Sequence, residues 1–244
     1  MKKKLLLILL AYMPLLMFAQ TGEKNIVELN LSSLAFKNIH ISYERKIDKK
    51  IVAVLGIRYM PETGLPYQNI FENYFNSTNI NYGRFQMGNY AITPEVRFFM
   101  QKGMRGFYVA PYFRYAYFNL TIPVEYQTTI NSQPVTKDAD FAGHVVSYSG
   151  GIMLGAQYTI WKKWILDLWI IGGEYGGGNG HLSANIQPPM GIAEQASLQY
   201  AINTIDTYPF KLTGKVTSST TAEMDGSGPW TGLRAFGINI GYRF

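Results

Sequence analysis

The sequence predicts an all-β protein, namely an eight-stranded antiparallel up-and-down transmembrane β-barrel, with ten strands if one further hairpin joins the ring. The C-terminal stretch 233–244 is the first reason. Its large apolar residues fall on alternate positions: Phe236, Ile238, Ile240, Tyr242 and Phe244. Strand faces repeat every two residues, so one face of this strand suits lipid and the other, small and polar, suits a crowded lumen.

Composition is the second reason. Aromatic residues make up 15% of the chain and charged residues only 16%, and the mean hydropathy is −0.04. This balance is too polar for helical membrane spans and too poor in charge for an ordinary soluble protein. Apolar residues in the chain alternate with polar ones and do not cluster, as expected for strands that face lipid on one side only.

Eight alternating segments are the third reason. They cover 25–34, 38–46, 50–59, 88–100, 106–119, 145–160, 164–175 and 232–244. Most reach the length of about 9 to 11 residues with which a tilted strand crosses a bilayer. An even number of strands also places both chain ends on one side, as in bacterial single-chain barrels.

The connections between these segments divide into two kinds. Those at 47–50, 101–106 and 161–164 are short and basic, whereas those at 60–87, 121–144 and 176–231 are long and rich in small and polar residues. A first strand that runs outward from the periplasm puts every short turn inside and every long loop outside, which is the arrangement of known outer-membrane barrels. We therefore expect three long extracellular loops.

Part of the last long connection, 197–219, also alternates. Asp206 is in phase with Leu198 and Tyr200, and a charge on a lipid-facing strand costs a few kcal/mol. We therefore predict a hairpin above the membrane, with a ninth and tenth barrel strand as the alternative. A soluble β-sandwich also explains alternation, but it does not explain faces made almost wholly of large apolar and aromatic residues.

Aromatic residues stand where the predicted strands would meet the two membrane interfaces. Trp161 and Trp164 flank a short turn and would lie in the inner aromatic girdle. The outer girdle would be supplied by Tyr59, Tyr90, Tyr117 and Tyr175.

The N-terminus resembles a secretory signal. Three lysines precede an apolar run that is interrupted by Pro14, and Ala19 comes before a polar start. We expect a cleaved signal peptide at 1–19 and a single barrel domain at 20–244, located in the bacterial outer membrane. Without those lysines the formal charge falls from +6 to +3, so no nucleic-acid partner is inferred. The chain has no cysteine, so disulfides do not hold this fold.

The faces opposite the apolar sets place both signs of charge in the lumen. The predicted lumen residues are Glu28, Glu44, Arg58, Glu95, Arg97, Arg114, Asp167 and Arg243. An eight-stranded barrel is just wide enough for side chains to fill, so four acids and four bases would form a packed ionic core and not a pore. A proton or ion relay is the functional alternative.

Little in the sequence points to catalysis. His40 falls on an inward face near Glu44 and is best interpreted as a core histidine. His181 and Ser183 have a spacing similar to that in outer-membrane lipid A deacylases, which are also eight-stranded barrels, but no acid is positioned beside them. We expect no catalytic residues, no cofactor and no metal site, and hence no enzyme.

Two stretches carry a family resemblance. Residues 28–47 and 51–59, with the triplet Tyr43-Glu44-Arg45, resemble the opening of uncharacterised outer-membrane barrels of the Bacteroidota, a domain of unknown function. The ending at Phe244 resembles the C-terminal signature of bacterial outer-membrane barrels, which the barrel-insertion machinery reads. The resemblance implies a location and a fold, and it supplies no reaction.

Three function hypotheses follow. The first is a non-enzymatic outer-membrane protein, structural or partner-binding through its extracellular loops, with lipid and an extracellular partner as its contacts. The second is a conduit for small solutes with a lateral opening, for which Pro94 and Pro111 mark interruptions of strand pairing. The third is a lipid A-modifying enzyme.

Overall fold

The computed structural model describes residues 23–69, 79–130, 132–205 and 209–244. The expected signal peptide at 1–19 lies outside the described residues. The elements in chain order are β1 (Asn25–Asn30), α2 (Leu31–Ala35), β2 (Ile39–Lys46), β3 (Ile51–Gly64), β4 (Gln86–Phe99), β5 (Gly106–Ile130), β6 (Gln133–Trp161), β7 (Trp164–Asn185), α4 (Ile192–Asn203), β8 (Lys211–Val216) and β9 (Thr221–Arg243).

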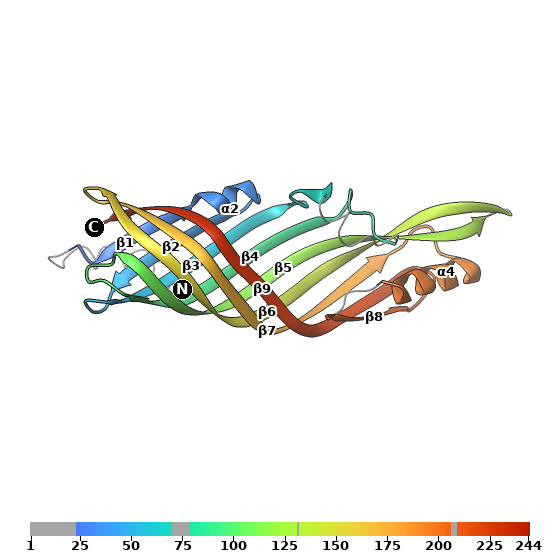
Figure 1. Ribbon diagram of the computed structural model, residues 1–244. Helices are drawn as coiled ribbons and strands as arrows, with labels where there is room; N and C mark the ends of the chain where they lie inside the picture. The colour runs from blue at the N-terminus through green and yellow to red at the C-terminus, as the bar shows by residue number, and fades with distance from the viewer. Residues whose placement is uncertain (1–22, 70–78, 131, 206–208) are drawn as a thin grey trace, which may run out of the picture.

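Eight of the strands close into a ring. Each strand pairs antiparallel with the next, in the order β1-β2-β3-β4-β5-β6-β7-β9, and β9 pairs back onto β1 from Ile26↔Arg243 to Asn30↔Asn239. β8 is not part of the ring, because it pairs only with the outer part of β9. The predicted eight-stranded antiparallel barrel is confirmed. In Figure 1 the C-terminus and the short turns gather at one end, and α4 lies at the other with the long β5–β6 hairpin.

Side chains alternate between the two faces of the ring. On β4, the odd-numbered residues from Ala91 to Phe99 are buried and the even-numbered ones between them are exposed. The exposed set is apolar on many strands, with examples in Ile57, Ile92, Phe113, Ile152 and Ile238. The expected girdle residues Trp161, Trp164, Tyr59, Tyr90 and Tyr175 are exposed as well, and Tyr117 is half-buried in a stack with Tyr90.

The first predicted strand is shorter than expected. It was predicted to run to residue 34, but β1 ends at Asn30, whose side chain accepts a hydrogen bond from the Ser33 amide at 2.6 Å and so caps α2. An N-terminal cap of this kind favours a helical turn over a continued strand. The first hairpin of the ring, formed by β1 and β2, is therefore shorter than its neighbours and does not reach the outer end of the barrel.

This short first hairpin leaves the ring incomplete towards its outer end. β9 pairs with β1 only up to Asn239, and it pairs with β8 only from Ser227 outward. Between these points α2 provides the contact, because Ser32 Oγ donates to the Phe236 carbonyl at 3.1 Å and accepts from the Ile238 amide at 3.0 Å. The wall is thus closed over its inner half and has a seam between β9 and β3 further out.

Two of the three long connections, 121–144 and 176–231, are mostly regular structure where loops were expected. β5 and β6 pair continuously from Gly106↔Gln157 to Ile130↔Gln133, so 121–144 is a strand hairpin. β7 and β9 likewise stay paired as far as Asn185↔Thr221, within the range 176–231. In the range 60–87, β3 continues to Gly64 and β4 starts at Gln86. Strand propensity and ladder hydrogen bonds extend these strands beyond the barrel.

The predicted hairpin at 197–219 is also corrected. Its first part belongs to α4, its described later part contains β8, and Asp206 lies outside the described residues. Leu198, Ala201 and Ile202 of α4 pack into an apolar core with Phe141, Leu182 and Met224 of the extended strands. Burial of one helix face on the sheet explains why a helix forms here. Neither described helix has the length and apolarity that a membrane-crossing helix needs.

Closure of the ring can be tested with paired cysteines in a chain that has none. Val27 on β1 lies directly opposite Tyr242 on β9, and both side chains are exposed. We expect Val27→Cys with Tyr242→Cys to form an intramolecular disulfide on oxidation, since opposed Cβ atoms lie within about 5.5 Å. The link is scored as faster migration on a non-reducing denaturing gel.

The matched control is Val27→Cys with Ile238→Cys. Ile238 is also exposed on β9, but it lies beyond the part of β9 that pairs with β1. This pair should stay reduced. Equal cross-linking of both pairs, or of neither, would contradict the closure described above.

Candidate functional site

Charged side chains fill the lumen at the level of Arg97, the centre of the inner half. Its guanidinium contacts Glu44, Glu95 at 2.6 Å, Asp167 at 3.3 Å and Glu28 at 3.7 Å. These acids come from β1, β2, β4 and β7, so the Arg97 side chain links four strands of the ring. Arg97 and all four acids have 4% exposure or less.

Neutral side chains complete this inner ionic cluster. Tyr108 donates to Asp167 at 2.8 Å and stacks beside Arg97, with 4.6 Å between the guanidinium carbon and the ring centroid. Gln157 accepts from Arg97 at 3.2 Å and donates to Glu44 at 3.3 Å. Phe99, Met104 and Ile165 pack as an apolar layer further towards the short turns. The lumen is filled at both levels.

Three of the acids also form a cluster of potential metal ligands. Carboxylate oxygens of Glu28, Glu44 and Asp167 lie within 4.8 Å of one another. Such oxygens suit a hard cation. Arg97 contacts all three carboxylates itself, so the guanidinium already supplies positive charge at this place.

The remaining predicted lumen residues are spread along the barrel. Arg114 contacts Glu174 at 3.3 Å and donates to Thr93 at 3.3 Å, further out than Arg97. Arg58 faces the same outer space. Arg243 is half-buried near the short turns, where its Nη2 donates to the Met104 carbonyl at 3.4 Å. The eight residues therefore form an inner group and an outer group, and Arg243 stands apart from both.

Two lumen charges were missed by strict alternation. Arg234 is 5% exposed and donates to Glu95 at 2.8 Å, and Glu174 is 7% exposed beside Arg114. On β7 both Ile170 and Ile171 are exposed, and the register against β6 shifts at this level. A bulge of this kind inserts one residue and reverses which positions face inward.

A matching change of phase occurs on the neighbouring strand. On β9, Arg234 and Gly237 both face inward although they are three residues apart, and Phe236 between them has a φ of 54°. Positive φ is rare for a residue with a bulky side chain. The two adjacent irregularities turn Glu174 and Arg234 into the lumen.

His40 is buried as predicted, but it is not hydrogen-bonded to a neighbour. Its ring packs against Trp169 with centroids 5.1 Å apart, and neither ring nitrogen has a hydrogen-bond partner in the described part of the chain. His40 lies directly across from Arg58 on β3. It therefore belongs to the outer group of lumen residues and not to the cluster around Glu44.

The His181 and Ser183 pair lies on an exposed face of β7. His181 Nδ1 is 2.8 Å from Asp225 Oδ1 on β9, so an acid is present that the sequence did not reveal. Their side chains are 51% and 70% exposed. No hydrogen bond joins Ser183 to His181 among the described residues, so the nucleophile–base contact of a triad is not formed.

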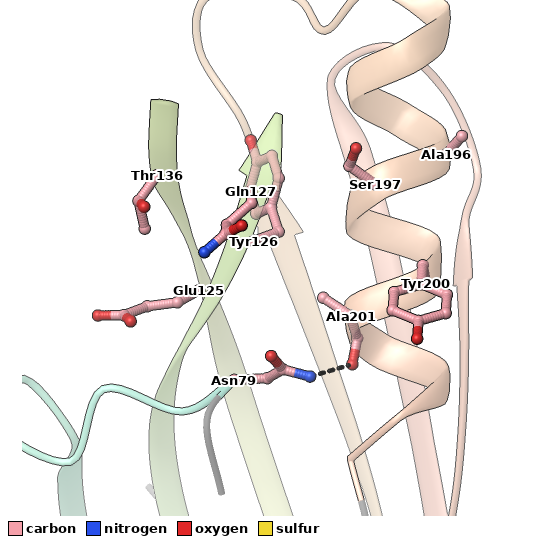
Figure 2. A pocket seen from close by; sticks show the side chains of 9 residues that line it. All are labelled: Asn79, Glu125, Tyr126, Gln127, Thr136, Ala196, Ser197, Tyr200 and Ala201. Carbon is pink, nitrogen blue, oxygen red and sulfur yellow. Dashed lines mark hydrogen bonds between the residues drawn. The ribbon is translucent and has the colours of Figure 1, made fainter. Parts of the chain in front are cut away.

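A pocket of 640 Å³ with a mixed lining lies at the outer end, between α4 and the β5–β6 hairpin. Figure 2 shows Glu125, Tyr126 and Gln127 on the strand side and Ser197 and Tyr200 on the helix side. The Asn79 amide donates to the Ala201 carbonyl at 3.4 Å across this space. The pocket is a notch on the surface of the outer region.

Glu194 holds α4 to the hairpin. Its Oε1 accepts from Lys137 at 2.7 Å and from Tyr126 at 2.9 Å. Burial raises the pKa of Glu194, but the hydrogen bonds from Lys137 and Tyr126 outweigh burial and lower it below its ordinary value. Burial and the Glu194 contact raise the pKa of Tyr126, which therefore remains a donor. The contact depends on an ionised carboxylate.

These observations define a class of protein: a closed antiparallel β-barrel with a charge-filled inner lumen and an elaborated outer end. The chain belongs to the family described as protein of unknown function (DUF3575), whose model matches residues 5–178. Membership of an uncharacterised family is thereby confirmed. A comparison with curated proteins found no match.

One solved structure aligns over most of the chain. The translocator domain of the autotransporter NalP from Neisseria meningitidis matches with 10% identity and a TM-score of 0.26, over 93% of this chain and 90% of its own. At this TM-score the alignment adds no weight to the fold, which rests on the strand pairing itself.

The inner ionic cluster makes a prediction about stability. We expect Arg97→Ala to lower the heat-unfolding midpoint, because it leaves several buried carboxylates without their cation at a cost of about 3 to 5 kcal/mol. The shift is measured by gel mobility of samples heated in detergent. Arg105→Ala, at an exposed arginine in the 101–106 turn, is the control and should leave the midpoint in place.

The Glu194 contact makes a prediction about pH. A lowered pKa in the folded state means that the carboxylate stabilises α4 docking above its ordinary pKa, and that this stability is lost as the pH falls through the lowered value. We expect the protection factors of the α4 amides, which are corrected for intrinsic exchange, to fall over that acid range and Glu194→Gln to remove the dependence. Glu223→Gln, at an exposed β9 residue, should preserve it.

Proposed function

We propose that the protein is an integral outer-membrane β-barrel that works by binding at its outer end, and neither by catalysis nor by conducting solutes. The observation that carries the proposal is a closed ring with apolar side chains outside and ion pairs inside. A soluble protein rarely exposes so large a contiguous apolar surface, whereas a barrel in lipid requires one.

The spacing of the aromatic residues supports a membrane location. Trp164 and Tyr175 lie at the two ends of the exposed apolar stretch of β7. At about 3.3 Å per residue this stretch is about 36 Å long, and a tilt of about 40° reduces its height to roughly 28 Å. This height matches the apolar band of a barrel in a bilayer, about 25 Å.

The filled inner lumen supports a closed barrel. Arg97, Tyr108, Gln157 and Asp167 are each 1% exposed or less, and the apolar layer around Phe99 lies beneath them. A solute would have to displace buried ion pairs in order to pass. At Pro94 and Pro111 the β4–β5 ladder has gaps, but the register is the same on both sides of them, so the two strands stay adjacent there.

The outer end supports a binding role. Extended strands, α4 and β8 form a second apolar core beyond the ring, and the notch of Figure 2 opens on its surface. Tyr200 and Ile192 of α4 are 72% and 89% exposed. Exposed aromatic and aliphatic side chains on a rigid support are typical of protein contact surfaces.

The route to this location is part of the proposal. The leader at 1–19 would direct export, and the final strand would engage the barrel-insertion machinery. The resemblance of the first strands to barrels of the Bacteroidota supports an origin in that phylum.

The membrane and channel parts of the proposal are tested together by reconstitution into liposomes. We expect the protein to fractionate with the lipid, to be folded by heat-dependent gel mobility, and to cause no swelling in small sugars. An open porin is the positive control. Swelling at a comparable rate would favour the conduit, and a folded monomer in detergent-free buffer would exclude the membrane location.

The proposed binding at the outer end is tested by removing residues 186–220, which include α4 and β8. Asn185 and Thr221 are directly paired, so a two-residue Asn-Gly turn can replace 186–220 and leave a tight β7–β9 hairpin. We expect the shortened barrel to remain folded and to lose partners that cross-link to the full chain in intact cells. Identical cross-links in the full and shortened chains would contradict binding by residues 186–220. In a separate test, a change in lipid A caused by Ser183→Ala would favour the hypothesis of a lipid A-modifying enzyme.

A further inference from the structure

Three arginines share one cavity in the outer half of the lumen. Arg58, Arg114 and Arg234 line an open space of 380 Å³. Their acid partners are few, since Glu174 contacts Arg114 and Glu95 is divided between Arg234 and Arg97. In the described part of the chain Arg58 has no ion pair or hydrogen bond. This space therefore carries an excess of positive charge.

Several hydrogen-bond donors in these arginines are buried and unused. Arg58 Nε, Arg114 Nη2 and Arg234 Nε have no acceptor among the described residues. Arg234 is 5% exposed, and its guanidinium carbon lies 3.7 Å from the Trp169 ring centroid and 5.1 Å from that of Tyr112. A desolvated guanidinium with free N–H groups is costly unless an acceptor reaches it, and the acceptors that suit it are carboxylate and phosphate oxygens.

The cavity lies behind the seam in the barrel wall. Its lining includes Leu233 and Ala235 of β9, Phe36 next to α2 and Met60 of β3, which are the elements on either side of that seam. Leu233 and Phe236 on the β9 side are 76% and 85% exposed. The approach to the arginines is therefore apolar and lies at the lipid-facing surface of the proposed membrane barrel.

A second cavity adjoins the first. It measures 300 Å³, shares Met87 and Phe118 with the arginine cavity, and is lined by apolar side chains and glycine, including Leu120, Leu182 and Trp230. Its volume equals that of about ten groups the size of a water molecule, at about 30 Å³ each. An apolar space of this kind does not hold water well but accepts hydrocarbon. The volume of this cavity suits one hydrocarbon chain and not two.

We propose that the outer half of the barrel binds a single-chain anionic amphiphile, with its head group on Arg58, Arg114 and Arg234 and its hydrocarbon chain in the adjoining apolar cavity. Neither cavity alone identifies this ligand. The arginines require an anion, the second cavity requires a chain, and the shared wall at Met87 and Phe118 places the two within one molecule's reach. The proposal names a ligand for the binding role proposed above and rests on it.

The test uses the protein folded in nanodiscs of zwitterionic phospholipid, titrated with dodecanoate, dodecyl phosphate and dodecanol. We expect saturable binding of at least one of the two anions and much weaker binding of the neutral alcohol. The two anions distinguish a carboxylate head from a phosphate head. If neither anion binds, or if the alcohol binds equally well, the proposal is overturned.

Arg58→Gln is the decisive variant, because it removes a charge without leaving an acid unpaired. It should weaken anion binding about tenfold or more, as expected for loss of a charge-assisted hydrogen bond, and leave heat-dependent gel mobility unchanged. Arg105→Gln is the matched control and should bind normally. Leu120→Trp, which fills the apolar cavity, should weaken dodecanoate more than octanoate.

Unchanged binding in Arg58→Gln or in Leu120→Trp would overturn the corresponding half of the site and with it the proposal. Swelling in the liposome experiment would instead overturn the closed-barrel part of the proposed function, since anion titration does not depend on the passage of solutes. The two proposals can therefore fail separately.

Discussion

The contact between Arg97 and its four carboxylates is the constraint on which the barrel depends. An eight-stranded ring leaves a lumen that only side chains can fill, and here charged side chains occupy the centre of its inner half. Buried ion pairs add little net stability, but each partner becomes very costly when the other is absent. Because the acids come from β1, β2, β4 and β7, they meet only when the whole ring is in register. The ionic cluster around Arg97 therefore selects the closed register of the strands more than it adds to the net stability of the barrel.

The outer half of the lumen follows a different rule. Acids predominate around Arg97, whereas arginines predominate around the 380 Å³ cavity, where Arg58 has no described partner. The wall is also different there, since the first hairpin stops at α2 and leaves a seam beside β9. A sealed inner half and an open, positively charged outer half therefore occur in one strand ring.

Alternation made most of the barrel predictable from sequence, because the outer surface and the lumen impose opposite demands on successive residues of each strand. It placed Arg97, Glu44 and Asp167 correctly on the inward face. It did not identify Glu174 and Arg234, because a bulge on β7 and an irregularity around Phe236 on β9 reverse the phase, and Ile170 and Ile171 are ordinary strand residues that do not mark the change.

The helices were missed for another reason, since signals were present but ambiguous. Asn30 before Ser33 is an N-cap pattern, and Leu198, Ala201 and Ile202 have helical spacing. Leu198, Tyr200 and Ile202 have strand spacing as well. Packing of α4 against the extended sheet decides between the two, and strand lengths beyond the ring are likewise set by pairing partners that no local pattern reveals.

The meeting of the first and last strands has a consequence for how the chain is assembled. Asn25 and Phe244 exchange both backbone hydrogen bonds, at 3.0 Å and 2.9 Å. Such a long-range pairing forms late, because the whole intervening chain must be arranged before the two ends meet. Until then β1 and β9 present bare edges, which readily pair with other chains. A nascent polypeptide of this type is therefore exposed to pairing with other chains until β9 reaches β1, and a copy that lacks β9 would keep β1 and β7 as bare edges.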